Sequence, residues 1–252
     1  MAIDRPALLS ALFAGGSVYP DDELDALAAA ASTDSELRAL VARRVAGEPI
    51  QYLVGHAEFA GLRLKVAPGA FVPRHRTEFL SGLAAARAAS GQRLLDLGCG
   101  VGTIAAFVTA RVSGVAVTAA DVDPVACECA QANLPLATVV LAGTPAELPS
   151  GPFDLIVANL PYVPSAEVVL MPRDARDHEL LAALDGGPDG LGPLRLYASA
   201  LPRLLAPGGR FLVEVAQDQA SVACGILQDA GLVRVGVHRD RDADATVVEA
   251  SA

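Results

Sequence analysis

The chain has 252 residues, of which 52% are hydrophobic and 19% are charged, so it can bury a sizeable core and is not intrinsically disordered. It carries 19 basic and 29 acidic residues, and this net charge of −10 argues against tight nucleic-acid binding and against an anionic membrane surface. No apolar run reaches the roughly 18 residues of a membrane span, and residues 1–6 lack a signal-peptide pattern. We therefore expect a cytoplasmic protein.

The first part of the chain is predicted to be helical over residues 5–45, because leucines recur at helical spacing. Apolar and polar residues then alternate around Gly61, which predicts a small hairpin over 57–66. Prolines and glycines follow it and mark a boundary near residue 70. The predicted domains are a helical domain, a linker with the hairpin and a large domain, over residues 1–46, 47–70 and 71–252.

From residue 76 onward, predicted helices alternate with predicted strands. The helices cover 76–89, 103–111, 124–133, 190–205 and 217–229, and the strands cover 93–97, 115–120, 138–141, 153–157, 211–215, 232–238 and 245–249. This alternation predicts an α/β fold with a doubly wound, mostly parallel sheet of seven strands, closed by an antiparallel hairpin. The glycine- and proline-rich tract over 186–193 is predicted to be a mobile loop.

The four cysteines show no pattern that is typical of a metal site or a disulfide framework. They form no CxxC pair and join no histidine cluster, so we interpret them as small buried hydrophobes in a reducing cytosol. They are Cys99, Cys127, Cys129 and Cys224. No metal is predicted, and the scattered histidines are interpreted as solvated or packed side chains.

A glycine turn follows the strand predicted over 93–97. It reads Asp96-Leu97-Gly98-Cys99-Gly100-Val101-Gly102. Glycines at alternate positions allow a tight turn and a close approach to a ligand, and the next helix offers free backbone N–H groups. The spacing is neither that of the dinucleotide fingerprint nor that of a P-loop. A plain strand-to-helix connection therefore stays an alternative.

An acidic residue, Asp121, ends the next predicted strand. A carboxylate at this place can accept hydrogen bonds from both hydroxyls of a ribose, although a surface aspartate at a strand end is also common. Together with the glycine turn, Asp121 favours a ribose-bearing cofactor. Asp96 is placed to receive a positively charged amino group, such as that of S-adenosylmethionine.

The tetrapeptide Asn159-Leu160-Pro161-Tyr162 follows an apolar strand directly, at the edge where open α/β sheets bind ligands. The Asn159 side-chain oxygen and the Leu160 carbonyl are two acceptors for a planar NH₂ group. Pro161 fixes the backbone, and Tyr162 offers a flat face for stacking. An Asn-Pro-type turn with a core tyrosine is the structural alternative.

In this order, the three motifs resemble those of class I S-adenosylmethionine-dependent methyltransferases. More closely, the chain resembles the release-factor glutamine methyltransferase family (HemK/PrmC type). Segments similar to that family cover residues 47–55, 71–78 and 184–191. The chain departs from the family pattern in having Leu160 for a proline, His75 and Arg76 for a proline and an acid, and Gly143-Thr144 for an acid-containing pair. It also lacks the arginine that usually precedes the last strand.

The resemblance implies a Rossmann-like methyltransferase that uses S-adenosylmethionine to methylate a glutamine side-chain amide of a peptide chain release factor. It implies that the helical domain helps to dock this protein. Catalysis and substrate binding are assigned to Asn159, Leu160, Pro161 and Tyr162. Cofactor binding is assigned to Asp96, Gly98, Cys99, Gly100, Val101, Gly102, Asp121, Val122, Thr144 and Asn159. No general base is assigned, and Glu78 and Glu214 are given surface roles.

Three other functions stay open at the level of sequence. The tetrapeptide also resembles that of ribosomal-RNA adenine dimethyltransferases, so an adenine amino methyltransferase on RNA or DNA is one of them, although the charge of −10 counts against it. A methyltransferase for a small amide or amine is the second. A catalytically silent binding module on the same fold is the third.

Overall fold

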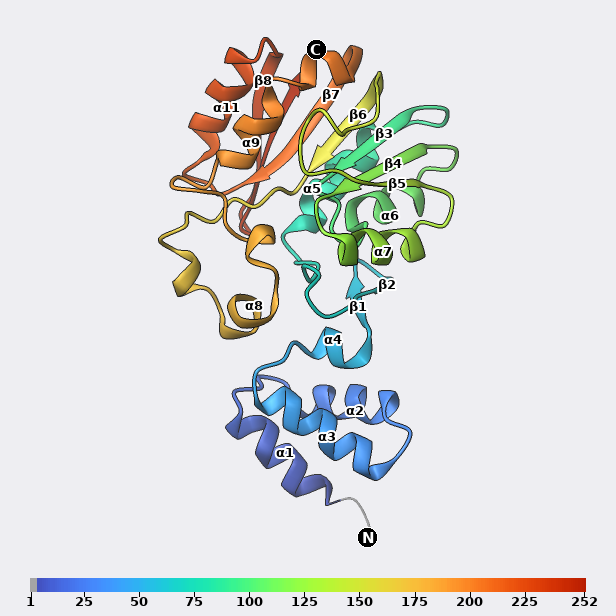
Figure 1. Cartoon of the computed structure of the whole chain (residues 1–252), viewed down its shortest axis with the longest axis vertical. Coiled ribbons are helices and arrows are strands. Elements are labelled where there is room, and N and C mark those ends of the chain that lie inside the picture. The colour runs from blue at the N-terminus through green and yellow to red at the C-terminus, as the bar shows by residue number, and fades with distance from the viewer. Residues whose placement is uncertain (1–3) are drawn as a thin grey trace.

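The computed structural model describes residues 4–252, so the expectation for residues 1–6 falls partly outside the described residues. Helices α1 (Arg5–Ala14), α2 (Pro20–Ala30) and α3 (Asp34–Val45) form a small domain that is set apart from the rest (Figure 1). Their inward leucines pack into a core of their own. Within residues 4–252, every helix is too short or too polar to cross a membrane.

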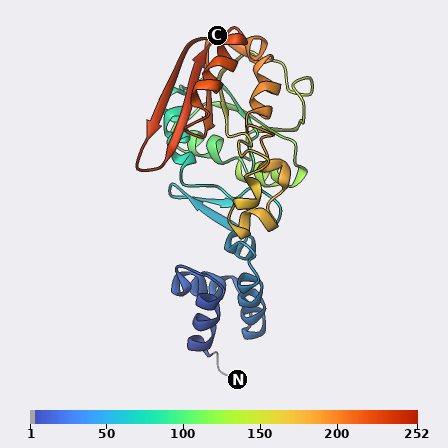
Figure 2. The ribbon, with the colours of Figure 1, turned by 90° about the vertical axis from the view of Figure 1, so that its left-hand side faces the viewer.

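A short connector joins this helical domain to the sheet. It consists of α4 (Ile50–Val54) and an antiparallel hairpin of β1 (His56–Phe59) and β2 (Leu62–Lys65), which confirms the predicted hairpin. The Asn133 side chain bonds to the Lys65 amide, at 2.8 Å, and to the Lys65 carbonyl, at 3.0 Å. These bonds fix the hairpin to the large domain, and the helical domain lies beyond it (Figure 2).

The large domain contains a seven-stranded sheet with the order β5-β4-β3-β6-β7-β9-β8. Its strands are β3 (Arg93–Leu97), β4 (Ala116–Asp121), β5 (Thr138–Leu141), β6 (Phe153–Ala158), β7 (Leu205–Val215), β8 (Val233–Asp240) and β9 (Ala245–Ser251). The first five pair in parallel, and β9 is antiparallel to both β7 and β8. The predicted fold, including the final antiparallel hairpin, is confirmed.

Helices cover both faces of this sheet, because the central strands are apolar on both sides. Leu94 and Leu95, adjacent in β3, belong to different core clusters, as the alternation of side chains along a strand requires. One cluster includes residues of α5 (Thr77–Arg87), α6 (Thr103–Thr109) and α7 (Pro124–Asn133). The other includes residues of α9 (Gly192–Ala198), α10 (Leu201–Leu204) and α11 (Ala220–Asp229).

Several local predictions need correction or addition. The helix predicted over 190–205 is two helices, α9 and α10, and Pro202 lies in the first turn of the second. The strand predicted over 211–215 begins at Leu205, because the Pro207-Gly208-Gly209 segment lies within β7 at a shift of the β6–β7 register. The short helix α8 (Arg173–His178) was not predicted.

The predicted mobile loop over 186–193 is instead a hydrogen-bonded turn. Gly186 donates to the Val163 carbonyl, and Gly192 donates to the Gly186 carbonyl, both at 2.8 Å. A Cβ on Gly190 would lie 2.1 Å from the Tyr162 carbonyl oxygen. Glycine is therefore required here by close packing against the segment that follows β6, and this packing holds the turn in place.

Candidate active site

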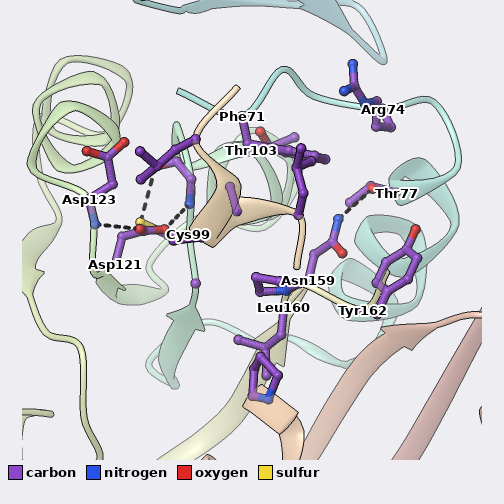
Figure 3. Close-up of a pocket in the computed structure, with 18 of the residues that line it drawn as sticks. Phe71, Arg74, Thr77, Cys99, Thr103, Asp121, Asp123, Asn159, Leu160 and Tyr162 are labelled. Atoms are coloured by element: carbon purple, nitrogen blue, oxygen red, sulfur yellow. Dashed lines mark hydrogen bonds between the residues drawn. The ribbon is translucent and has the colours of Figure 1, made fainter. Parts of the chain in front are cut away.

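A cavity of about 810 Å³ opens at the carboxyl ends of β3, β4 and β6. The glycine turn, the Asp121 segment and the Asn159–Tyr162 tetrapeptide all line it, so the structure brings the three sequence motifs together (Figure 3). Open α/β sheets bind ligands at this edge. The size lies within the range of small-molecule sites.

The glycine turn passes close to the tetrapeptide. Gly98 has a positive φ of 66°, and a Cβ built on it would lie 3.0 Å from the Leu160 side chain. The Gly98 amide donates to the Ala120 carbonyl at 2.8 Å. A side chain at this position would strain the backbone and crowd the Leu160 side chain, which explains why glycine is favoured at the first position of the turn.

Asp121 links the turn to the end of β4. One carboxylate oxygen accepts from the Gly100 amide at 2.8 Å, and the other accepts from the Asp123 amide at 2.9 Å. Burial raises the pKa of this carboxyl above its usual value, and the backbone amides oppose that rise. Each oxygen keeps a further lone pair, so Asp121 can still accept hydrogen bonds from two ligand hydroxyls.

Asp96 has no exposed surface and does not line the cavity. Its Oδ2 accepts from the Ala105 amide at 3.0 Å, in the first turn of α6, whereas Oδ1 is buried without a partner among the described residues. Burial raises its pKa to about 7, and nearby Asp121 adds to the rise. The proposed contact between Asp96 and an amino group stays a prediction.

Gly102 and Thr144 also lie outside the cavity lining. A Cβ on Gly102 would lie 2.8 Å from the Leu134 side chain, so this glycine allows α6 to pack against the end of α7. The Thr144 amide donates to the Glu147 carboxylate, while its neighbour Gly143 lines the cavity. Cofactor contacts by Gly102 and Thr144 stay predictions. Cys99, Gly100, Val101 and Val122 do line the cavity, and their contacts with the cofactor stay predictions.

Asn159 stands at the end of β6 with its side chain in the cavity (Figure 3). Its Nδ2 donates to the Thr77 hydroxyl at 3.0 Å. Within residues 4–252, no donor bonds to its Oδ1 or to the Leu160 carbonyl. The Leu160 side chain is buried in the core. The tetrapeptide therefore leaves two carbonyl-type acceptors without a donor among the described residues, and both belong to residues that line the cavity.

Tyr162 is held by its hydroxyl, which donates to Glu214 at 3.1 Å. Burial and the neighbouring carboxylate raise the pKa of Tyr162 to about 12, so the phenol stays protonated at neutral pH. Glu214 is only 2% exposed, so the surface role expected for it is wrong. Glu78 is half-buried and pairs with exposed His75 at 3.0 Å.

The segment over 71–77, which leads into α5 and to which the sequence analysis assigned no site residue, forms a further wall. Phe71, Arg74 and Thr77 all line the cavity. Arg74 lies over the Phe71 ring and forms a 2.6 Å ion pair with Glu179, a side chain that is 1% exposed. The Val72 amide also donates to Glu179, at 3.2 Å. Glu179, just after α8, thus ties the segment over 163–186 across the cavity.

The residues present fit S-adenosylmethionine. Asp121 can bind ribose hydroxyls, and the glycine turn leaves room for a ligand beside the backbone. Asp96 Oδ1, behind the turn, is a buried acceptor without a partner among the described residues. This set of acceptors suits a ligand that carries ribose hydroxyls and an amino group.

Comparison with known sequences points to the same chemistry. The family model of the methyltransferase small domain matches residues 75–172. A protein of Geobacter sulfurreducens named release factor glutamine methyltransferase is 39% identical over 198 residues, covering 77% of this chain and 70% of its own length. A protein of Bordetella pertussis with the same name is 39% identical over 210 residues, covering 81% of this chain and 77% of its own length.

Solved structures agree on the fold. A methyltransferase from Pyrococcus furiosus superposes with a TM-score of 0.59 at 17% identity, covering 83% of this chain and 96% of that one. A ribosomal protein L11 methylase from Lactobacillus delbrueckii gives 0.52 at 18% identity, covering 75% and 84%. From the identity and coverage of the sequence relatives, the chain belongs to the release factor glutamine methyltransferase family, whose methyl donor is S-adenosylmethionine.

Proposed function

We propose that this protein methylates the side-chain amide nitrogen of a glutamine in a peptide chain release factor. The observation that carries the proposal is the pair of acceptors at the cavity wall, Asn159 Oδ1 and the Leu160 carbonyl, neither of which has a donor among residues 4–252. A primary amide offers two N–H donors in one plane, which matches two such acceptors.

S-adenosylmethionine supplies a methyl group that its sulfonium makes electrophilic. The residues of the chain have to hold the amide nitrogen, a poor nucleophile, in line with that group. Positioning of this kind lowers a barrier by about 7–11 kcal/mol in favourable cases. The nitrogen becomes more positive as it gains the methyl, so its hydrogen bonds to Asn159 and Leu160 strengthen in the transition state. As the N–CH₃ bond forms, the S–CH₃ bond breaks and sulfur keeps the electron pair, and the nitrogen then releases one proton to solvent.

Features of the surface support a protein as the methyl acceptor. Phe13, Val18 and Tyr19 of the helical domain are each more than two thirds exposed, and Val169 and Leu170 are exposed in the segment that closes over the cavity. Exposed apolar side chains of this kind are typical of protein-binding surfaces. We propose that the helical domain docks the release factor, and that the reaction takes place in the cytoplasm.

The test is methylation of a purified release factor with labelled S-adenosylmethionine, read by mass spectrometry of its peptides. We expect a mass increase of one methyl group on a single glutamine, and none when that glutamine is replaced by glutamate. Labelling of RNA, or of free glutamine in place of the release factor, would contradict the proposal. A chain that binds S-adenosylmethionine in calorimetry but labels no release factor would contradict it as well.

A further inference from the structure

The side-chain amide of Asn159 ends in an oxygen and an NH₂ group of nearly equal shape, and only the oxygen is useful for the proposed reaction. The oxygen can accept a hydrogen bond from a substrate NH₂, whereas the Asn159 NH₂ group would repel it. Some neighbouring group must therefore fix whether the oxygen or the NH₂ group points into the cavity. In the structure this neighbour is Thr77, which accepts from Nδ2 at 3.0 Å.

Thr77 is itself held firmly. It begins α5, its amide donates to the Arg74 carbonyl at 3.0 Å, and its own carbonyl accepts from the Ser81 hydroxyl at 2.9 Å. Its side chain is buried, with 3% exposure for the residue. A threonine hydroxyl has one hydrogen and two lone pairs, so while it accepts from Asn159 its hydrogen must go to another acceptor.

Glu214, near the end of β7, offers a carboxylate acceptor. Its Oε1 accepts from the Tyr162 hydroxyl at 3.1 Å, and its buried Oε2 has no hydrogen-bond partner among the described residues. Burial raises the pKa of Glu214, and the nearby Thr77 hydroxyl is the largest effect that opposes this rise. Tyr162 and Arg76 are the other polar groups that face this carboxylate. A carboxylate accepts and does not donate, so it sets the direction of the hydroxyls around it.

We propose that Glu214 and Thr77 form a positioning relay that holds the Asn159 amide with its oxygen toward the methyl acceptor. In this relay the Thr77 hydroxyl donates its hydrogen to the unpartnered Glu214 Oε2 and accepts from Asn159 Nδ2. Neither Glu214 nor Thr77 touches the reacting atoms, and both act through Asn159. Tyr162 shares the carboxylate, so the same group also fixes the other end of the tetrapeptide. This inference rests on the proposed function, because it assumes an acceptor with an NH₂ group.

The test compares variants of Thr77 in the release-factor assay. Thr77→Val keeps the shape and removes the hydroxyl, and we expect kcat to fall by about 10- to 100-fold, the worth of one or two hydrogen bonds. The affinity for S-adenosylmethionine should stay within twofold. Thr77→Ser restores the hydroxyl and should recover most of the loss. Thr109→Val, which removes a hydroxyl bonded only to carbonyls of its own helix, is the matched control and should leave kcat unchanged.

Glu214→Gln separates a relay from two unrelated structural roles. In a relay, this change lowers kcat more in the parent protein than in the Thr77→Val background, where the link through Thr77 is already broken and only the Tyr162 contact is left to lose. Losses of kcat in Thr77→Val and Glu214→Gln that multiply in the double variant would overturn the proposal. So would a Thr77→Val variant with unchanged kcat, or a Thr77→Ser variant no better than Thr77→Val.

A second measurement does not need the methyl acceptor, and so separates this inference from the proposed function. Nuclear magnetic resonance can follow the exchange of the two Asn159 side-chain N–H protons with water in the full chain. We expect slow exchange in the parent and in Thr77→Ser, and fast exchange in Thr77→Val. Equal exchange in all three would overturn the relay, even if the parent methylates release factors. Parent protein that shows the expected exchange but labels no release factor would contradict the proposed function alone.

Discussion

The two sides of the cavity are built in different ways. On the side proposed for the cofactor, Gly98 and Gly100 come from one short turn, and backbone amides hold the Asp121 carboxylate. On the side proposed for the methyl acceptor, Thr77 and Asn159 are 82 residues apart in the sequence, and Tyr162 and Glu214 are 52 residues apart. Backbone amides hold one side, and side chains from three elements hold the other.

This difference determines what a substitution can do. Backbone N–H groups survive any side-chain replacement, so changes on the cofactor side should weaken binding by degrees. On the acceptor side each contact depends on a single side chain, so one replacement can remove the arrangement. The predictions below test this contrast, from the largest effect to the smallest.

Asn159→Ala should lower kcat for methyl transfer far more than it weakens cofactor binding. Removal of one preorganised transition-state contact costs about 10²- to 10³-fold in kcat. The loss is expected because Oδ1 supplies one of the two acceptors for the substrate NH₂. Labelled-methyl assays measure kcat, and calorimetry with S-adenosylmethionine serves as the control. Turnover within a few-fold of the parent would remove Asn159 from the mechanism.

Asp121→Ala should act on the other side and weaken the cofactor instead. We expect its Kd to rise by about 10- to 100-fold, the worth of hydrogen bonds to a charged group, with kcat at saturating cofactor changed only a few-fold. Asp121→Asn keeps the size of the side chain and one acceptor, so its Kd for S-adenosylmethionine should lie between those of the parent and of Asp121→Ala. Unchanged affinity in calorimetry would refute the ribose contact.

Arg74→Ala tests the tie between the two walls of the cavity. It leaves the buried Glu179 carboxylate without its ion pair, and the free energy of unfolding should fall by roughly 1–3 kcal/mol. Chemical denaturation measures this loss. Arg195→Ala, which breaks an exposed pair with Asp189, is the matched control and should not change the unfolding midpoint. Equal stability in the two variants would show that the tie is weak.

Asp96→Asn should change how stability depends on pH. The pKa of Asp96 is about 7 in the folded chain against 3.8 when unfolded, so the folded state binds the extra proton between these values. The parent is therefore stabilised as pH falls from about 8 to 5, by at most about 1.4 kcal/mol per pH unit from this group. Unfolding curves over that range should show a flatter dependence in Asp96→Asn. An identical slope would contradict the raised pKa.

Much of the fold could be predicted because its signals are local. Alternating apolar strands and helices gave the sheet, and the hairpin around Gly61 has the predicted place. Predictions failed where a contact between residues far apart in the sequence determines the local structure. The 186–193 tract has the composition of a loose loop, yet the Tyr162 backbone packs against Gly190 and fixes it. Glutamate is normally a surface residue, yet Glu214 is buried beside Tyr162 and Thr77.

The sequence by itself determined the cofactor turn, the acid that follows it and the tetrapeptide, because each lies within a few residues of one strand end. Only the tertiary structure decided how the Asn159 amide is oriented and which carboxylate lies behind it. That information depends on where α5 and β7 come together, and side chains so far apart in the chain meet only after the sheet has formed. A short motif therefore indicates which reaction to expect, while the packing around it determines whether the reacting groups face the right way.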